Sequence, residues 1–275
     1  EPTQALDEKR RAAEQLLRSG HHERGTALVR EVLFAAGVTY PESPLSLVFS
    51  LLRARIALAL RGLRVTQQAS DGVTALLALR VDAARSAGSG FSMSDNLRGA
   101  YFQSLALLHA LATGDLHRIH YALCMEICFL STGAGKARKK TDVRLAVASQ
   151  WAERLGTSEA KAMLQVARGY CPYFRGQWSE AKAILSEAER LTRVTVGLTF
   201  ENNATRYTLY RALVFRGDLV ELRERSEVAL RDALERGDVL SQVNFRSIAM
   251  AFLALADDDL DRCRDELASA GKLLT

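Results

Sequence analysis

The chain contains little proline and little cysteine for its length. Only 4 prolines and 4 cysteines occur among 275 residues, and the 18 glycines are an ordinary number. A β-sandwich or barrel of this size would need turn residues at short intervals, and a disulfide-rich scaffold would need more cysteine. Hydrophobic residues make up 48% and charged residues 25%, which argues against disorder. The composition favours a soluble helical protein and leaves its chemistry open.

A strong excess of one charge is also missing. There are 37 Lys and Arg residues against 32 Asp and Glu residues, a net charge of +5. Most opposite charges lie three or four residues apart, as in 221–236, which is typical of solvated helix faces. One basic run, 136-KARKK-140, follows Gly133 and Gly135. We interpret it as a solvated loop, with an anion or partner contact as the alternative. Because it lacks interleaved aromatic residues, nucleic-acid binding is not expected.

Long uncharged hydrophobic runs do not occur. No stretch of 18 uncharged apolar residues is found, so the sequence predicts no membrane association. We expect a cytoplasmic protein whose cysteines are reduced and buried. The chain begins with Glu1, and a helical pattern already runs by residue 4. We therefore expect a piece of a longer polypeptide.

Apolar residues recur at three- and four-residue spacing almost throughout, while two-residue alternation is rare. Trp178, Ala181, Leu185 and Ala188 form one such stripe. The periodicity predicts helices at 4–19, 22–36, 44–61, 71–87, 95–113, 115–131, 140–155, 158–175, 177–193, 200–216, 218–236, 239–256 and 259–273.

The last three turns between helix pairs are evenly spaced. The turns FRG, FRG and ADD end at Gly176, Gly217 and Asp258, and Asn203 and Asn244 recur at the same interval. Glycine supplies the left-handed residue that ends a helix, and an aspartate after it can cap the next one. A helical hairpin repeated at about 41 residues is typical of an α-solenoid, in which stacked neighbours form a continuous core.

We therefore predict an all-α fold, a right-handed α-solenoid of TPR-like helical hairpins, as one elongated domain over 1–275. Loops are expected at 88–94 and, as a basic insertion, at 132–139. The expected hairpins are 4–36, 44–87, 95–131, 158–193, 200–236 and 239–273, with the helix 140–155 inserted.

Two motifs suggest a phosphate-binding loop and a metal site, but the first lacks required residues and the second has the wrong spacing. In 131-STGAGKARKK-140, Ala137 stands where a phosphate-binding loop needs Ser or Thr, and Leu130 stands where it needs glycine. His117, His120, Cys124 and Cys128 resemble a metal set, but on one helix the outer pair would be about 16 Å apart. Zinc holds its ligands at about 2.0–2.3 Å. We predict no cofactor, no metal and no disulfide.

The remaining cysteines and aromatic residues are interpreted as structural. Cys171 precedes Pro172 inside an apolar run, where a thiol is inert. A cluster of aromatic residues near this point is typical of a packed hairpin corner rather than a ligand site. Its members are Tyr170, Tyr173, Phe174 and Trp178.

Four stretches carry a resemblance to a known family: 45–65, 88–129, 173–191 and 228–259. The most specific part is G-[FL]-S-M-x-D-x-x-R-G-A-x-F-Q. It is matched by Gly90, Phe91, Ser92, Met93, Asp95, Arg98, Gly99, Ala100, Phe102 and Gln103. These residues resemble the C-terminal TPR-like helical-repeat region of large bacterial serine/threonine protein kinases of myxobacterial type. In those proteins a kinase domain is followed by an AAA-like, STAND-type ATPase and then by the repeats.

The resemblance implies a module downstream of catalytic domains, and it transfers no catalytic residue. Neither the kinase motifs nor the ATPase phosphate loop occurs in this sequence. The spacing near 41 differs from the TPR period of about 34, and the W-x₂-L-G-x₂-Y pattern is absent, so "TPR-like" describes shape. Similar repeats occur in STAND-type transcriptional regulators and in defence proteins.

We therefore expect a non-catalytic protein–protein interaction or sensor module that regulates an attached signalling kinase/ATPase. The alternative is the ligand-sensing arm of a STAND-type regulator or defence protein, and an enzyme is the third possibility. The expected partners are a protein or peptide on the concave face and the upstream domains of the same chain. Polar and aromatic side chains on the first helices of the hairpins suit that role. They are Arg98, Gln103, Asn203, Arg206, Tyr207, Asn244 and Arg246. Alternatively, Asn203 and Asn244 bond neighbouring helices.

Overall fold

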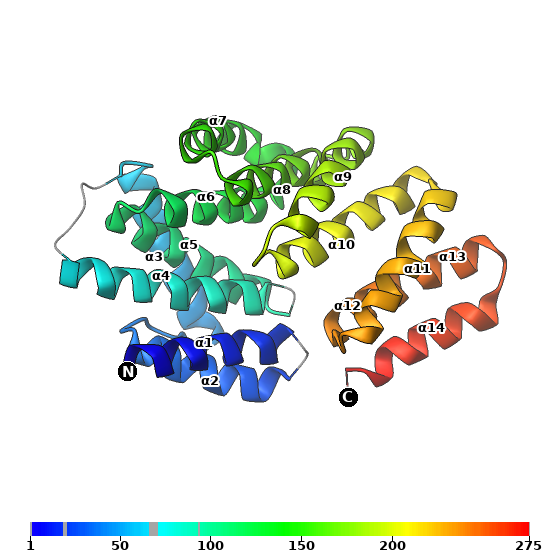
Figure 1. Ribbon diagram of the computed structural model, residues 1–275, viewed down its shortest axis with the longest axis horizontal. Helices are drawn as coiled ribbons and strands as arrows, with labels where there is room; N and C mark the ends of the chain where they lie inside the picture. The colour runs from blue at the N-terminus through cyan, green and yellow to red at the C-terminus, as the bar shows by residue number, and fades with distance from the viewer. Residues whose placement is uncertain (1, 19–20, 66–70, 93, 275) are drawn as a thin grey trace. The chain divides into compact units, whose positions relative to one another are not determined.

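The computed structural model describes residues 2–18, 21–65, 71–92 and 94–274, without the side chains of 2–4, 18, 22 and 71–74. Within these ranges the chain is helical and contains no strand, which confirms the all-α prediction (Figure 1). The residues form two compact units, Glu1–Phe129 and Leu130–Thr275, called unit 1 and unit 2 below. The single elongated domain and the solenoid stay predictions.

Unit 1 is built around α4 and α5, which pack along each other, while α1 contacts α2 and α4, and α3 contacts α5. Asp95 caps α5 by accepting a hydrogen bond from the backbone N–H of Arg98, and Ser43 caps α3 in a reciprocal capping box with Ser46. The helices are α1 (Pro2–Arg18), α2 (His22–Ala35), α3 (Pro44–Arg61), α4 (Asp71–Phe91), α5 (Asn96–Thr113) and α6 (Leu116–Ser131).

The predicted loop at 88–94 is wrong over its first four residues. Helix α4 continues through Phe91, and Gly88 lies where α4 meets α5. A Cβ atom on Gly88 would lie 3.2 Å from the backbone nitrogen of Gln103, so glycine permits the close approach of the two helices. Glycine in a helix interior is normally unfavourable, so the local sequence by itself favours a loop here. Met93 lies outside the described residues, as do the predicted turn residues Ser19 and Gly20.

Aromatic rings fill the centre of unit 1. The rings of Tyr101 and Phe102 lie 4.9 Å apart, and Phe91 stacks on Phe102 at 6.2 Å. The hydroxyl of Tyr101 donates to the carbonyl of Thr39 at 3.1 Å, so its polar end is satisfied inside the core. These contacts join α4, α5 and the segment after α2.

Unit 2 continues the helical pattern with short connections. Its basic loop is shorter than predicted, because residues 134–137 form a 3₁₀ turn and α7 begins at Arg138 rather than at 140. The predicted helix 239–256 contains a π-helical segment in its middle. The elements are η1 (Ala134–Ala137), α7 (Arg138–Leu155), α8 (Ser158–Phe174), α9 (Trp178–Val194), α10 (Thr199–Arg216), α11 (Leu219–Glu235), α12 (Val239–Asn244), η2 (Phe245–Met250), α13 (Ala251–Ala256) and α14 (Leu260–Lys272).

The three evenly spaced turns have the same geometry. Gly176, Gly217 and Asp258 have φ angles of 75°, 74° and 59°, in the left-handed region. In each turn the next residue donates its backbone N–H to a carbonyl five residues earlier, at 2.9, 3.0 and 2.9 Å. This bond ends one helix and directs the chain into the next.

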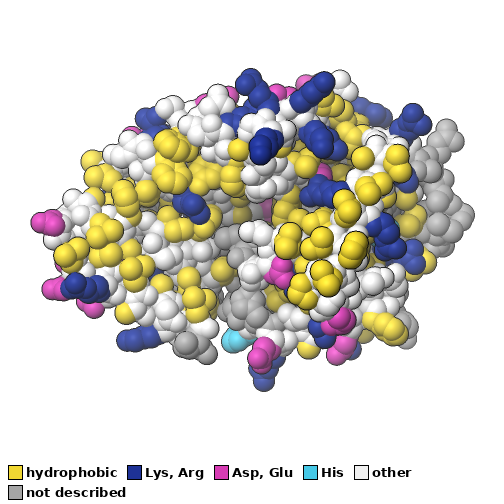
Figure 2. Space-filling model, turned by 180° about the vertical axis from the view of Figure 1, so that it is seen from behind, with side chains coloured by type: hydrophobic (Ala, Val, Ile, Leu, Met, Phe, Trp, Pro, Cys, Tyr) yellow, Lys and Arg dark blue, Asp and Glu magenta, His cyan; other side chains and the backbone are white. Residues whose placement is uncertain are grey.

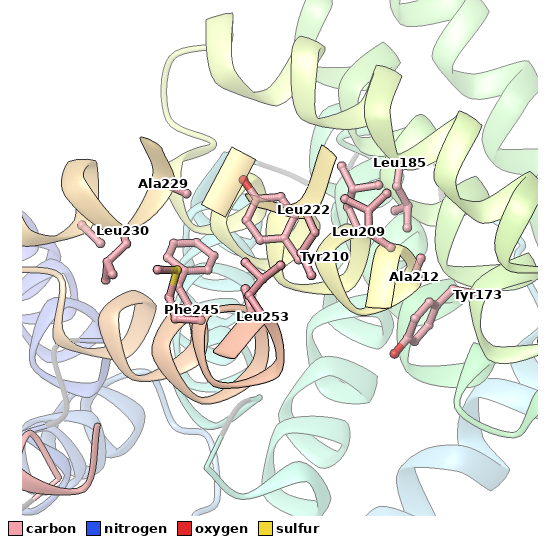
Figure 3. Packing of buried hydrophobic residues seen from close by; sticks show 14 of the residues in the cluster. Tyr173, Leu185, Leu209, Tyr210, Ala212, Leu222, Ala229, Leu230, Phe245 and Leu253 are labelled. Carbon is pink, nitrogen blue, oxygen red and sulfur yellow. The ribbon is translucent and has the colours of Figure 1, made fainter. Parts of the chain in front are cut away.

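Helix α9 packs against α8 and α10, and α11 packs against α10, α12 and η2. Their inner faces form one hydrophobic cluster. Figure 3 shows Tyr210 on α10 beside Leu222 and Leu253, with Phe245 of η2 close by. The Tyr210 and Phe245 rings lie 5.5 Å apart. The cluster joins the second helix of each pair to the helix that follows it.

Candidate functional site

The predicted ligand residues on α5 are used inside unit 1. Gln103 is 3% exposed and donates its side-chain amide to the carbonyl of Ala122 at 2.7 Å, which bonds α5 to α6. Arg98 pairs with Asp95 one turn earlier, and its guanidinium lies 5.0 Å from the ring centre of Tyr40. Neither side chain is presented to solvent as a free recognition group.

A small cavity lies beside Gln103 between α4, α5 and α6. Its volume is about 10 Å³, which holds no more than a water molecule. Arg118 at its edge donates to Asp82 at 3.1 Å and to Asp115 at 2.6 Å. Burial acts to raise the pKa of Asp115, but hydrogen bonds from Arg118 outweigh it and hold that pKa below its usual value. The pair of Arg118 with Asp82 joins α6 to α4, and the cavity is too small for a substrate.

The predicted residue Arg206 lies in a buried ion-pair network of unit 2. Its Nε donates to Glu189 of α9 at 3.0 Å, and its Nη1 donates to Asp232 of α11 at 3.1 Å. Arg225 supplies a second donor to Glu189 at 2.8 Å. Burial by itself lowers the pKa of Arg206, yet neighbouring Tyr210 and the two carboxylates raise it overall. Arg206 therefore connects three helices and stays charged.

Asn203 and Tyr207 lie on the same helix as Arg206 and also make internal contacts. Asn203 donates its amide to the Asp238 carboxylate at 2.7 Å, and Asp238 in turn caps α12. The Tyr207 hydroxyl accepts from Arg211 at 3.0 Å. Asn203 thus joins α10 to the start of α12. This is the alternative role considered for Asn203 above, a bond between neighbouring helices.

The remaining two predicted residues lie where α12 passes into the π-helical segment. Arg246 pairs with Glu266 of α14, and Asn244 is half-buried at the end of α12. Five of the seven predicted residues therefore belong to unit 2 and two to unit 1. In unit 2, the side chains of Asn203, Arg206 and Arg246 join one helix to another.

The histidine and cysteine set on α6 is mostly internal. The ring Nε2 of His120 lies 3.6 Å from the sulfur of Cys124, and both residues are buried. Cys128 is buried one turn further on, whereas His117 is exposed. In the part of the chain that the structure describes, no group of three or more His, Cys, Asp or Glu residues could hold a metal ion.

The basic run lies at the start of α7. Lys136, Lys139 and Lys140 are exposed, and Arg138 lies 3.6 Å from Asp142. The first turn of α7 contains no acidic residue, although the positive end of a helix dipole favours one. The run is an exposed basic surface at a helix start.

The outer face of α3 is an exposed hydrophobic surface that was not predicted from the sequence. Its apolar residues recur at three- and four-residue spacing, which places them on one side of the helix. Leu45, Phe49 and Leu60 are 73%, 68% and 84% exposed. The full set is Leu45, Val48, Phe49, Leu52, Ile56 and Leu60, and we call it the α3 outer face.

The opposite face of α3 is also apolar, because Leu47, Ala54 and Leu58 are buried. A helix that is hydrophobic all round is normally covered on both sides. Arg53 is exposed on α3, Arg64 is exposed three residues after its end, and the sequence contains no acidic residue between 43 and 70. Figure 2 shows one face of the molecule on which hydrophobic side chains lie between Lys and Arg residues. The signal in the sequence is that apolar residues of 44–61 fall on both the buried and the exposed side of the helix.

One window among the described residues, Val239–Ala256, is long and apolar enough to span a membrane by length and composition alone, and 44% of it is buried. It coincides with α12, η2 and α13, which contribute Phe245 and Leu253 to the unit 2 core. Comparison with protein-family models, with curated proteins and with solved structures found no match for this chain.

Proposed function

We propose that this chain is a non-catalytic protein–protein interaction or sensor module that regulates an attached signalling kinase/ATPase in the cytoplasm. In this proposal it is an α-solenoid of TPR-like hairpins whose repeat, about 41 residues, falls within the range of known helical-repeat families. The equal hydrogen bonds in the three evenly spaced turns support the repeat. The resemblance to the C-terminal region of bacterial kinases supports the attachment to catalytic domains.

The observation that carries the proposal is the α3 outer face. A contiguous exposed apolar surface of several hundred Å² commonly marks an interaction site. The face follows one side of a helix, so a second helix can lie along it with apolar residues at the same three- and four-residue spacing. The partner that fits is an amphipathic helix of another protein or domain.

The charge around this face indicates the partner's chemistry. Arg53 is exposed on the same helix and Arg64 just after it, with no acidic residue nearby in the sequence. A partner helix with Asp or Glu beside its apolar face would pair with these arginines and be guided into register. A second copy of α3 is disfavoured, because Arg53 lies near the middle of the helix and an antiparallel copy would bring two Arg53 side chains together.

We place binding here rather than on the seven predicted residues for a physical reason. Arg206 and Gln103 already satisfy buried partners, and a ligand would have to break those bonds. Removing one partner of a buried charged pair is costly. The α3 outer face needs no such rearrangement, since its side chains are already exposed.

The test uses two defined helical peptides with the same leucine face, one flanked by glutamates and the other by lysines. We expect fluorescence anisotropy to show binding of the acidic peptide, weakened at least about 10-fold by Leu52→Glu and by Arg53→Glu. The matched control is Val228→Glu, at an exposed valine on α11. Equal binding of both peptides, or binding only to anionic lipid vesicles, would overturn the proposal.

The attached effector is tested separately by reading the full-length open reading frame. An upstream kinase domain followed by an ATPase domain supports regulation of those activities. A terminal helix-turn-helix would instead assign the chain to a transcriptional regulator and overturn the kinase proposal.

A further inference from the structure

Three side chains form a strip across neighbouring helices of unit 2. Tyr170 on α8, Arg211 on α10 and Phe252 on α13 lie equally far before the left-handed residues of the three similar turns. Helix α10 packs against α8 and against η2, which leads directly into α13. All three side chains are half-buried, so each keeps part of its surface in solvent. The strip therefore presents an arginine flanked by aromatic residues on the two neighbouring helices.

Among the described residues, Arg211 has no carboxylate partner. Its Nη1 donates to the hydroxyl of Tyr207 at 3.0 Å, and its guanidinium lies 5.5 Å from the centre of that ring. Arg246, which is half-buried on η2, pairs instead with Glu266. A guanidinium has five N–H donors, and a partly buried charge is most stable beside an opposite one. Arg211 therefore has donors left for an anion from outside.

The polar groups beside Arg211 are tyrosine hydroxyls that can donate. The hydroxyl of Tyr207 accepts from Arg211, so its own hydrogen can be given to a ligand. Tyr173 lies at the edge of the hydrophobic cluster (Figure 3), and burial raises the pKa of its phenol, which therefore keeps its hydrogen. Burial by itself lowers the pKa of Arg211, yet Tyr173 and Tyr207 raise it overall. The cluster is a positive charge beside two hydroxyl donors, which suits an anion.

The charge of this cluster fits a single negative charge. Arg175 at the end of α8 and Arg216 at the end of α10 are two further cations, but they pair with Asp142 and Asp218. Arg211 is the cation left without a counter-ion. A carboxylate carries one charge and matches the planar guanidinium in bidentate geometry. A phosphate monoester carries nearly two charges, so a carboxylate is the better match.

The flanking rings indicate the shape of the ligand. Packed helices lie about 8–10 Å apart, so the side chains of the strip follow one another at about that distance. A polyproline II segment has about three residues per turn and rises about 3.1 Å per residue, which places every third side chain on one side at intervals of about 9 Å. Such a segment can place an apolar, an acidic and a second apolar side chain over Tyr170, Arg211 and Phe252. Aromatic surfaces commonly bind segments of this kind.

We propose that the strip of Tyr170, Arg211 and Phe252 binds a polyproline II segment of a partner protein, in which Asp or Glu is the third residue after one apolar residue and the third before another. Its carboxylate pairs with Arg211 and accepts a hydrogen bond from Tyr207. Its apolar side chains pack on the two flanking rings. The strip belongs to unit 2 and the α3 outer face to unit 1, so this is a second interaction surface beyond the proposed function, and neither depends on the other.

The test uses the full chain and a fluorescein-labelled peptide, Leu-Pro-Pro-Glu-Pro-Pro-Leu, capped at both ends. We expect fluorescence anisotropy to show saturable binding below about 1 mM. Replacing the peptide's glutamate by glutamine should weaken binding at least about 10-fold. The peptide Leu-Pro-Glu-Pro-Pro-Pro-Leu has the same composition and charge with the glutamate moved by one position, and it should bind as weakly. Equal binding of the three peptides would overturn the proposal.

Variants of the chain test the arginine itself. Arg211→Gln should weaken binding of the glutamate peptide at least about 10-fold. Arg211→Lys should retain part of the affinity, because the charge stays while the planar fork is lost. The matched control is Arg168→Gln, which removes a half-buried arginine that donates to Ser149 of α7 and lies outside the strip. Leu52→Glu on α3 should leave this binding unchanged, which separates the result from that of the α3 outer face. Circular dichroism checks that each variant is folded.

Three results would contradict the proposal. The first is no binding of the glutamate peptide below about 1 mM. The second is an Arg211→Gln variant that binds as tightly as wild type, or an Arg168→Gln variant that loses as much affinity. The third is tighter binding of a peptide with phosphoserine in place of the glutamate, which would assign the cluster to phosphate instead of carboxylate.

Discussion

The two units hold their helices together by different means. In unit 1, α4 and α5 approach closely at Gly88 and Gly99, and aromatic rings fill the space beside them. In unit 2, α9, α10 and α11 are joined by buried charges around Arg206 and Glu189 in addition to their hydrophobic cluster. A glycine contact depends on shape alone. A buried ion pair stabilises only while every member is present, because each removal leaves an unpaired charge.

The two units also differ in the direction in which burial shifts the pKa of a titratable side chain. In unit 2, burial raises the pKa of Tyr210, and the nearby Glu189 carboxylate raises it further, so this phenol stays neutral over the ordinary pH range. In unit 1, burial lowers the pKa of His109 on α5, and the neighbouring Arg80 lowers it further. Unit 1 therefore contains a histidine whose pKa lies below its usual value.

The largest effect is expected from breaking the unit 2 network. Arg206→Met should lower the free energy of unfolding by about 3–5 kcal/mol, because Glu189 stays buried with fewer partners. The double variant Glu189→Leu with Arg206→Met should recover much of that loss. Urea denaturation of the two variants measures the difference. A double variant no more stable than Arg206→Met would show that the network is not what joins these helices.

An intermediate effect is expected from the glycine contacts of unit 1. A Cβ atom on Gly99 would lie 3.1 Å from the Cα of Ser92, a backbone atom that cannot rotate away. Gly99→Val should therefore cost about 1–3 kcal/mol of stability through overpacking. Gly135→Ala is the matched control, since its Cβ would meet nothing within 4 Å. Thermal unfolding of both variants checks the prediction, which fails if they melt at the same temperature.

The smallest effect is a pH dependence confined to unit 1. The folded-state pKa of His109 lies below its usual value of 6.5, so the unfolded chain binds a proton that the folded chain does not. Stability should therefore fall as the pH drops through 6.5 and level off below the folded-state pKa. His109→Gln should remove this part of the pH dependence, whereas replacing the exposed His117 by Gln should not. If the stability of wild type and of His109→Gln depends on pH in the same way between about pH 5 and about pH 8, the prediction is wrong.

The helices were predictable because the interactions that define them are local. The predicted 44–61 coincides with α3, and 158–175 differs from α8 by one residue. Apolar spacing marks the face of each helix, and glycine or aspartate at the turn marks its end. Gly176 and Gly217 adopt the left-handed conformation that the spacing indicated. Local sequence failed at Gly88, where contact with α5 outweighs the low helix propensity of glycine.

The sequence by itself determined the all-helical class, most helix boundaries and the spacing of the last three turns, since each depends on residues within a few positions of one another. The tertiary structure alone decided which polar side chains face a neighbour. Arg206 and Gln103 looked like ligand-binding residues on a helix surface, yet both are buried in contacts with other helices. It also decided that Leu267 is exposed while Leu185 is buried, because burial depends on whether another helix covers a face rather than on the pattern along it.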